Sequence, residues 1–96
     1  MNFMHFCTRT TQGAGDVKNS KQRRERIYAL AERLDGKVVA DYLVTGRYDV
    51  VLITDFADGD NAAKFAMSIG AKGNLATSTA RAWTGEEAQS LMDGVE

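Results

Sequence analysis

Near the start of the chain a histidine and a cysteine lie two positions apart, at His5 and Cys7, a pairing that suggests a nucleophile and its base. In an extended strand such residues share a face, but their Cα atoms are roughly 7 Å apart, which is too far for direct activation. We therefore expect both side chains to fill structural positions. If their face lines a cavity between subunits, His5 becomes the leading proton-transfer candidate, because it alone is expected to titrate near neutral pH.

A second group of reactive side chains follows Gly46, in the run Arg47, Tyr48 and Asp49. In a structural interpretation, Gly46 adopts a positive φ, Asp49 accepts hydrogen bonds from backbone amides and Tyr48 packs its ring. In a functional interpretation, the guanidinium, phenol and carboxylate meet a partner subunit at the mouth of a shared barrel, where they hold a small oxygenated ligand. The residues alone leave both interpretations open.

Two further features have ordinary structural explanations. Arg81 and Trp83 share a strand face and could stack on a ligand, although an aromatic side chain at a strand end is more typical of a core or interface anchor. Gly70, Gly73 and Asn74 follow a predicted helix and precede a predicted strand, which is the wrong order for a phosphate-binding loop. We interpret them as a helix stop and a turn.

Composition limits the classes of partner. The chain has 96 residues, enough for one domain over 1–96, and its 44% hydrophobic and 26% charged residues are ordinary for a globular protein. A net charge of −1 creates no long-range attraction for phosphate backbones, so we expect no nucleic-acid partner. The basic run 21–26 is typical of a solvated helix face, and an anion-binding patch is the less favoured alternative.

The cysteine count and the hydropathy indicate the compartment. A single cysteine and a single histidine make no metal site without carboxylate help. The first residues lack the basic and long apolar regions of a signal peptide, and no stretch approaches the roughly 18 apolar residues of a membrane-spanning helix. We expect a protein of the reducing cytoplasm, with no metal, no cofactor and no membrane partner.

Hydrophobic periodicity predicts the secondary structure. Alternating patterns predict strands over 3–9, 37–45, 47–56 and 75–83, with the second and third hinged near Gly46. Helical spacing predicts one helix over 21–34 that Gly36 ends, and another that runs from Asp58 or Asp60 to Gly70. A capping box at Thr84 begins a short helix over 84–92, and 10–16 is predicted to be a loop.

The order β-α-β-β-α-β predicts an α+β, ferredoxin-like fold. Its four-stranded antiparallel sheet carries two helices on one face, with the first and third strands at the centre. Side chains such as Phe6, Leu43, Val51 and Ile53, if left in water on the uncovered face, would each forfeit about 1.5–3 kcal/mol, against about 5–15 kcal/mol for a whole small domain. We therefore expect sheet-to-sheet self-association, as a homodimer or a higher oligomer.

Several stretches of the chain, in the same order along it, resemble the GYD domain family. The family takes its name from a glycine, a tyrosine and an aspartate, which here are Gly46, Tyr48 and Asp49. The stretches are 42–51 around the Gly46 turn, Thr10, Gln12 and Gly13 after the first strand, 17–20 at the helix entry, 70–74 and 77–83. Lys21 departs from the family, since relatives commonly have a proline there, which affects only how the helix starts. The resemblance implies a dimeric α/β-barrel arrangement and no established activity.

These observations define the candidate site and the competing functions. The candidate ligand-binding residues are His5, Gln12, Arg47, Tyr48, Asp49 and Arg81, and no catalytic residue is assigned. We favour a non-catalytic assembly or small-ligand-binding protein, whose partners are copies of itself and a small organic ligand. The alternative is a cofactor-poor enzyme of monooxygenase or isomerase type with its site in the barrel cavity, which rests on analogy of fold. A nucleic-acid-binding module using 21–26 is a third, less favoured hypothesis.

Overall fold

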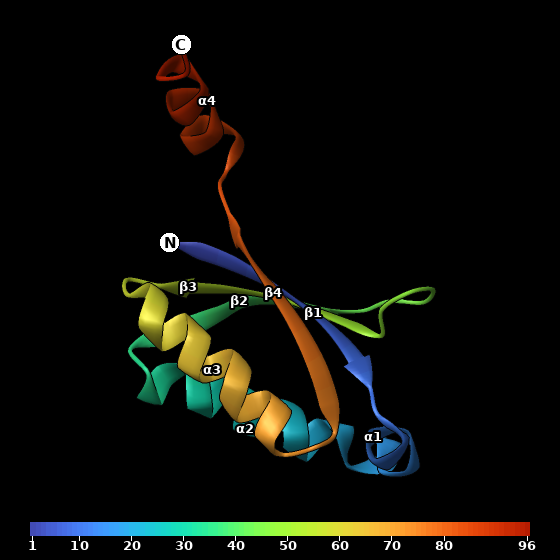
Figure 1. The fold of residues 1–96 in the computed structure, drawn as a ribbon. Coiled ribbons are helices and arrows are strands. Elements are labelled where there is room, and N and C mark those ends of the chain that lie inside the picture. Colours follow the sequence, from blue (N-terminus) through green and yellow to red (C-terminus); the bar gives the residue numbers. More distant parts are fainter.

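The strands form one antiparallel sheet with the spatial order β2-β3-β1-β4, in a computed structural model that describes residues 1–96. The elements, in chain order, are β1 (Asn2–Arg9), α1 (Thr11–Gly15), the 3₁₀ turn η1 (Val17–Asn19), α2 (Ser20–Arg33), β2 (Gly36–Leu43), β3 (Val50–Phe56), α3 (Gly59–Ala71), β4 (Leu75–Ala82) and α4 (Gly85–Asp93). The first and third strands are central, and α2 and α3 lie side by side under one face of the sheet (Figure 1). The predicted ferredoxin-like arrangement is therefore confirmed.

The core lies between the sheet and the helices α2 and α3. Because side chains alternate along a strand, Cys7 of β1 and Leu52 and Phe56 of β3 turn toward the helices, where they are buried. Phe65 of α3 meets them, with its ring centroid 5.5 Å from that of Phe56. The other buried apolar side chains are Ala31, Ala62, Ile69 and Leu75.

The other face of the sheet, which we call the open face, carries no helix along it (Figure 1). Its members follow from the strand register and comprise the larger residues Met4, Phe6, Tyr42, Val51 and Ile53 and the small residues Ala76, Ser78 and Ala80. The prediction that Leu43 belongs to this face is wrong. Leu43 pairs with Val50, whose side chain points toward the helices, so Leu43 lies on the helix side at the sheet edge.

Two helix ends differ from prediction in the residue that turns the chain. After α2 the left-handed residue is Asp35, with φ of 58°, and not Gly36. Gly36 instead begins β2, where an added Cβ would lie 2.3 Å from the Phe56 ring, so close approach requires the glycine there. Likewise α3 continues to Ala71, and Gly73 (φ 83°) rather than Gly70 reverses the chain.

Two connections also differ from prediction. The predicted loop 10–16 contains α1, which forms because Thr10 caps it, accepting a hydrogen bond from the Gly13 N–H at 3.1 Å. The turn around Gly46 is longer than a tight hairpin, since β2 ends at Leu43 and β3 begins at Val50. Gly46 itself has φ of 106°, the positive value that the sequence predicts.

The C-terminal helix α4 begins with the predicted capping box. The Thr84 N–H donates to the Glu87 carboxylate at 2.9 Å, and the Glu87 N–H donates to Thr84 Oγ1 at 3.1 Å. Beyond this start α4 projects from the end of β4, away from the sheet (Figure 1), and none of its residues is buried. Its apolar side chains Leu91 and Met92 are therefore exposed in the single chain.

Candidate functional site

His5 lies on the face of β1 that α2 and α3 cover, and its side chain is fully buried. Its ring centroid is 5.0 Å from that of Phe65. Both ring nitrogens have hydroxyl partners at 2.8 Å, Nδ1 with Thr79 Oγ1 and Nε2 with Thr54 Oγ1. Burial lowers the pKa of His5 from 6.5 to about 4, so the imidazole is neutral at pH 7. His5 does not line the open face, and the condition for a proton-transfer role at a sheet interface is therefore not met.

Cys7, two residues further along β1, is equally buried. Its thiol lies 3.7 Å from the carbonyl oxygen of His5, to which it donates a weak hydrogen bond. Burial raises the pKa of the Cys7 thiol to about 11, which keeps it protonated at neutral pH. A protonated thiol without access to solvent is a packing group and not a nucleophile.

In the turn after Gly46, the Asp49 carboxylate makes a hydrogen bond within the chain. Asp49 Oδ2 accepts a hydrogen bond from the backbone N–H of Arg9 at 2.7 Å, and the Asp49 N–H donates to the Cys7 carbonyl oxygen at 2.9 Å. These bonds tie the connection between β2 and β3 to the end of β1, which agrees with the structural interpretation of Asp49. Its neighbours remain near the surface: the Tyr48 ring centroid lies 5.1 Å from that of Phe6, and the Arg47 guanidinium lies 5.6 Å from the Tyr48 ring centroid.

Gln12 joins the loop after β1 to the turn before β4. Its side-chain amide donates to the Lys72 carbonyl oxygen at 3.1 Å and to Asn74 Oδ1 at 3.0 Å. Gly13 lies against the same turn, because an added Cβ would be only 2.1 Å from the Asn74 carbonyl oxygen. The stretches 10–13 and 70–74, which resemble the family separately, are thus in contact in the fold. The Gln12 amide is hydrogen-bonded within this contact.

Arg81 anchors the end of β4. Its guanidinium lies 4.5 Å from the Trp83 ring centroid and 5.9 Å from that of Phe3, and Nη1 donates to the Asn2 carbonyl oxygen at 3.3 Å. The side chain borders a shallow groove between α3 and β4 whose wall includes Thr79, the hydroxyl partner of His5.

The structure therefore distributes the candidate ligand-binding residues instead of gathering them. His5 is inside the core, Gln12 lies at the α1 end, Arg81 lies at the end of β4, and only the adjacent residues Arg47, Tyr48 and Asp49 stay together. Of these, Tyr48 borders the open face, because its ring packs at a tilt against that of Phe6.

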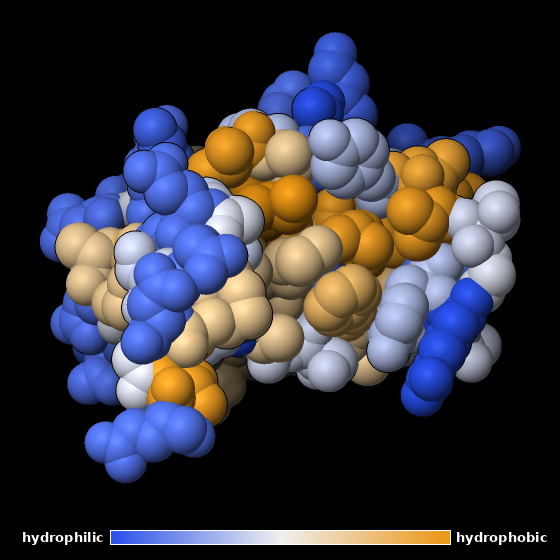
Figure 2. All heavy atoms as spheres, turned by 90° about the horizontal axis from the view of Figure 1, so that it is seen from above, coloured by the Kyte–Doolittle hydropathy of each residue, from blue (hydrophilic) through white to orange (hydrophobic).

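The open face is the more extensive candidate site. Seen from above, on the side away from α2 and α3, hydrophobic side chains gather across the middle of the molecule (Figure 2). Met4, Phe6, Val51 and Ile53 on this face are only partly buried, and Tyr42 is 57% exposed. An apolar surface of this kind on a soluble domain typically marks an interaction site.

A polar cluster that was not predicted from the sequence joins α2 to β2. Asp41 Oδ2 accepts hydrogen bonds from Arg24 Nε at 2.7 Å and from the Tyr28 hydroxyl at 2.5 Å. Partial burial opposes ionisation of Asp41, but the bonds from Arg24 and Tyr28 outweigh it and lower the pKa of the carboxyl. The i, i+4 spacing of Arg24 and Tyr28 was the available signal, since it places both on one helix face.

No helix of the chain combines the length and the apolar character needed to cross a bilayer. The chain holds no cluster of three or more His, Cys, Asp or Glu side chains placed to bind a metal ion.

Comparison with known proteins gives one match. The family model of the GYD domain matches residues 3–92, which is nearly the whole chain. No curated protein and no solved structure matches the chain significantly.

Proposed function

This chain belongs to the GYD domain family, and from that premise we propose that it is a non-catalytic module that self-associates through its open face. One observation carries the proposal: a continuous apolar sheet surface, made by Met4, Phe6, Val51 and Ile53, that no part of the chain covers. Two such faces pack about 10 Å apart in sheet-on-sheet assemblies, which removes both from water. The simplest occupant is a second copy of the chain.

Two further features support this arrangement. The helix α4 leaves β4 on the side of the open face (Figure 1), where its exposed Leu91 and Met92 can pack on the same second copy. On β4 the open face carries only small side chains, Ala76, Ser78 and Ala80, which permit close approach of another sheet.

In such a dimer a small organic ligand would bind at the rim. Tyr48 packs against Phe6 at the edge of the open face, and the Arg47 guanidinium lies over the Tyr48 ring. A guanidinium beside a phenol is suited to hold a carboxylate or another oxygen-rich group. We leave Asp49 out of this proposed ligand site, because its Oδ2 already accepts a hydrogen bond from the Arg9 amide.

The alternative of a cofactor-poor enzyme with a site between the sheets has weaker support. It needs a group that exchanges protons at the interface, and His5 lies on the opposite face of the sheet, buried and neutral. No observation favours a specific reaction.

The oligomeric state tests the proposal, with Ala80→Arg as the main variant. Ala80 is exposed in the single chain, so an arginine there leaves the monomer folded but puts a large charged group where the second sheet must approach. We expect a dimer for the wild type and a monomer for Ala80→Arg by light scattering at micromolar concentration. The matched control is Ala29→Arg, at an exposed position of α2, which should stay dimeric. A wild-type chain that is a stable monomer over this range would refute the proposal.

A further inference from the structure

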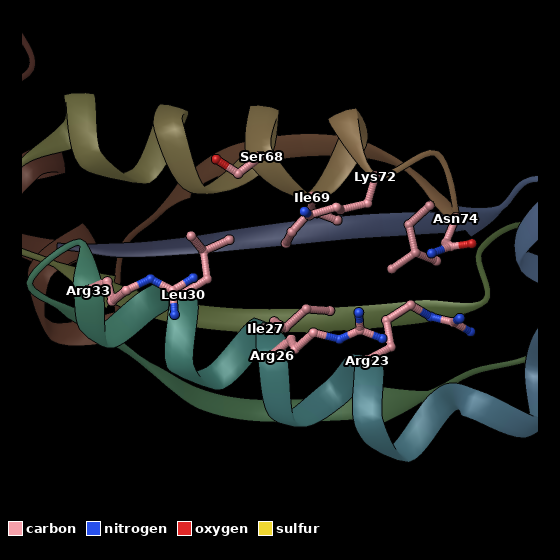
Figure 3. A pocket seen from close by; sticks show the side chains of 10 residues that line it. Arg23, Arg26, Ile27, Leu30, Arg33, Ser68, Ile69, Lys72 and Asn74 are labelled. Carbon is pink, nitrogen blue, oxygen red and sulfur yellow. The ribbon is translucent and has the colours of Figure 1, made fainter.

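A groove runs between α2 and α3 on the side of the molecule opposite the open face. Figure 3 shows Ile27 and Leu30 of α2 pointing toward Ile69 of α3. Ile69 and Leu75, which are only 5% and 6% exposed, form its apolar floor. Its volume is about 520 Å³, within the range of about 300–1,000 Å³ that is typical of small-molecule sites.

The charges around the groove all have one sign. Arg23, Arg26, Arg33 and Lys72 line it together with the neutral Ser68 and Asn74, and no acidic side chain does. In a chain with a net charge of −1, this concentration of positive charge is local.

Most of this charge is not used within the fold. Arg23 is neutralised by Asp16, whose Oδ2 lies 3.0 Å from Nη1. Arg26 makes one long hydrogen bond, from Nε to the Gln22 carbonyl oxygen at 3.5 Å, and no ion pair. Lys72 takes part in hydrogen bonds only through its backbone and is in none of the three ion pairs, which leaves its ammonium donors available to a ligand. Figure 3 shows Arg26 and Lys72 on opposite walls of the groove.

We propose that this groove binds a small amphiphilic anion, an organic carboxylate or phosphate monoester with an aliphatic tail. The head would be held between Arg26 and Lys72, where a guanidinium and an ammonium can both donate to one anionic group. The tail would lie along Ile27, Leu30 and Ile69, and would remove from water the part of their apolar surface that faces the groove. The groove combines two features that a merely solvated basic helix face lacks, an apolar floor and cations from two separate segments, α2 and the turn after α3.

Titration calorimetry with octanoate and octyl phosphate tests the proposal, and amide chemical shifts locate the ligand. We expect saturable binding, with shifts at Ile27, Leu30 and Ile69, and an affinity that rises by about fourfold for each CH₂ added between hexanoate and octanoate. Lys72→Gln and Arg26→Gln should each weaken binding by about threefold to tenfold, and added salt should weaken it further. Lys64→Gln is the matched control, because Lys64 is exposed on α3, the helix that Lys72 follows, but does not line the groove.

Other outcomes would overturn the proposal. These are the absence of octanoate and octyl phosphate binding, shifts that cluster on the open face instead, or equal affinity in Lys72→Gln and the control. A further arm uses phosphatidylglycerol vesicles: attachment to vesicles without binding of the free anions would mean that the basic surface recognises a membrane and not a small molecule. Ala80→Arg, the variant that should be monomeric, should bind octanoate as the wild type does. Failure of this proposal is therefore distinguishable from failure of the self-association proposal.

Discussion

His5 is a side chain that could transfer protons, but in this fold its role is structural. Each of its ring nitrogens lies 2.8 Å from a different threonine hydroxyl, so one hydroxyl can accept from the protonated nitrogen while the other donates to the unprotonated nitrogen. The neutral imidazole is therefore fully satisfied within the core. No carboxylate is hydrogen-bonded to the ring to stabilise a positive charge, which agrees with the lowered pKa.

This environment predicts how stability depends on pH. The pKa of His5 is about 4 in the folded chain and 6.5 as the reference value for an exposed histidine, so the unfolded chain takes up the proton first as the pH falls. The free energy of unfolding should be unaffected by His5 above pH 6.5, and should fall between pH 6.5 and 4. By pH 5 the loss reaches about 2 kcal/mol, since each pH unit contributes about 1.4 kcal/mol.

Urea unfolding at pH 7 and pH 5, at one fixed protein concentration, measures this loss. His5→Gln keeps a polar side chain beside Thr54 and Thr79 but cannot titrate, so its stability should change by about 2 kcal/mol less than that of the wild type over the same interval. An identical pH dependence in the two proteins would contradict the assignment.

At the scale of elements, the contact between the loop after β1 and the turn before β4 joins distant parts of the chain. The Thr10 hydroxyl donates to the Gly73 carbonyl oxygen at 2.5 Å, and the Thr10 N–H donates to the Asn74 carbonyl oxygen at 3.1 Å. Gly13 permits this approach because it has no Cβ. The loop in turn starts α1 and leads into α2, so it also sets where α2 begins.

Gly13→Ala should therefore destabilise the fold. The added Cβ would lie 2.1 Å from the Asn74 carbonyl oxygen, a backbone atom that cannot move without shifting the turn, and we expect a loss of about 1–3 kcal/mol in the free energy of unfolding. Gly15→Ala is the matched control, because an added Cβ at Gly15 meets nothing within 4 Å. Thermal or urea unfolding compares the two variants. Equal stability would show that the turn at Asn74 can shift to accommodate the added Cβ without loss of stability.

At the scale of the whole molecule, the chain presents apolar surface that its own fold does not use. The open face and α4 are both uncovered, and the chain measures 50 × 31 × 18 Å, long for its mass because α4 extends beyond the sheet (Figure 1). Trp83 and Leu91, at 47% and 55% exposure, lie along this extension. The second copy that we propose on the open face would cover both.

Removal of residues 84–96 tests the role of α4. Since no residue of α4 is buried in the single chain, the truncated protein should keep its fold and its dilute-limit stability. The dimer should weaken, with a dissociation constant raised by tenfold or more, because the apolar side chains of α4 then contribute nothing to the interface. Sedimentation equilibrium measures the constant. A truncated chain with unchanged self-association would exclude α4 from the interface.

Much of the fold could be predicted because it depends on local patterns. Alternation placed the strands, helical spacing placed α2 and α3, and the Thr84 capping box placed the start of α4. The roles of the glycines were harder to predict. Gly36 and Gly13 are required by contacts with residues distant in sequence, Phe56 and Asn74, which no local pattern reveals.

The candidate site, like the fold, could be predicted only in part. The residues alone predict that both faces of the sheet are apolar and that reactive side chains are few, because composition and period-two alternation do not depend on folding. Which face each residue occupies depends on how the strands and helices pack. Folding buries His5 under α3, bonds Asp49 to the Arg9 amide, and brings Arg26 of α2 opposite Lys72, which lies in the turn after α3. The physical reason is that partners, burial and charge clusters arise between segments far apart in sequence, and exist only once the chain has folded.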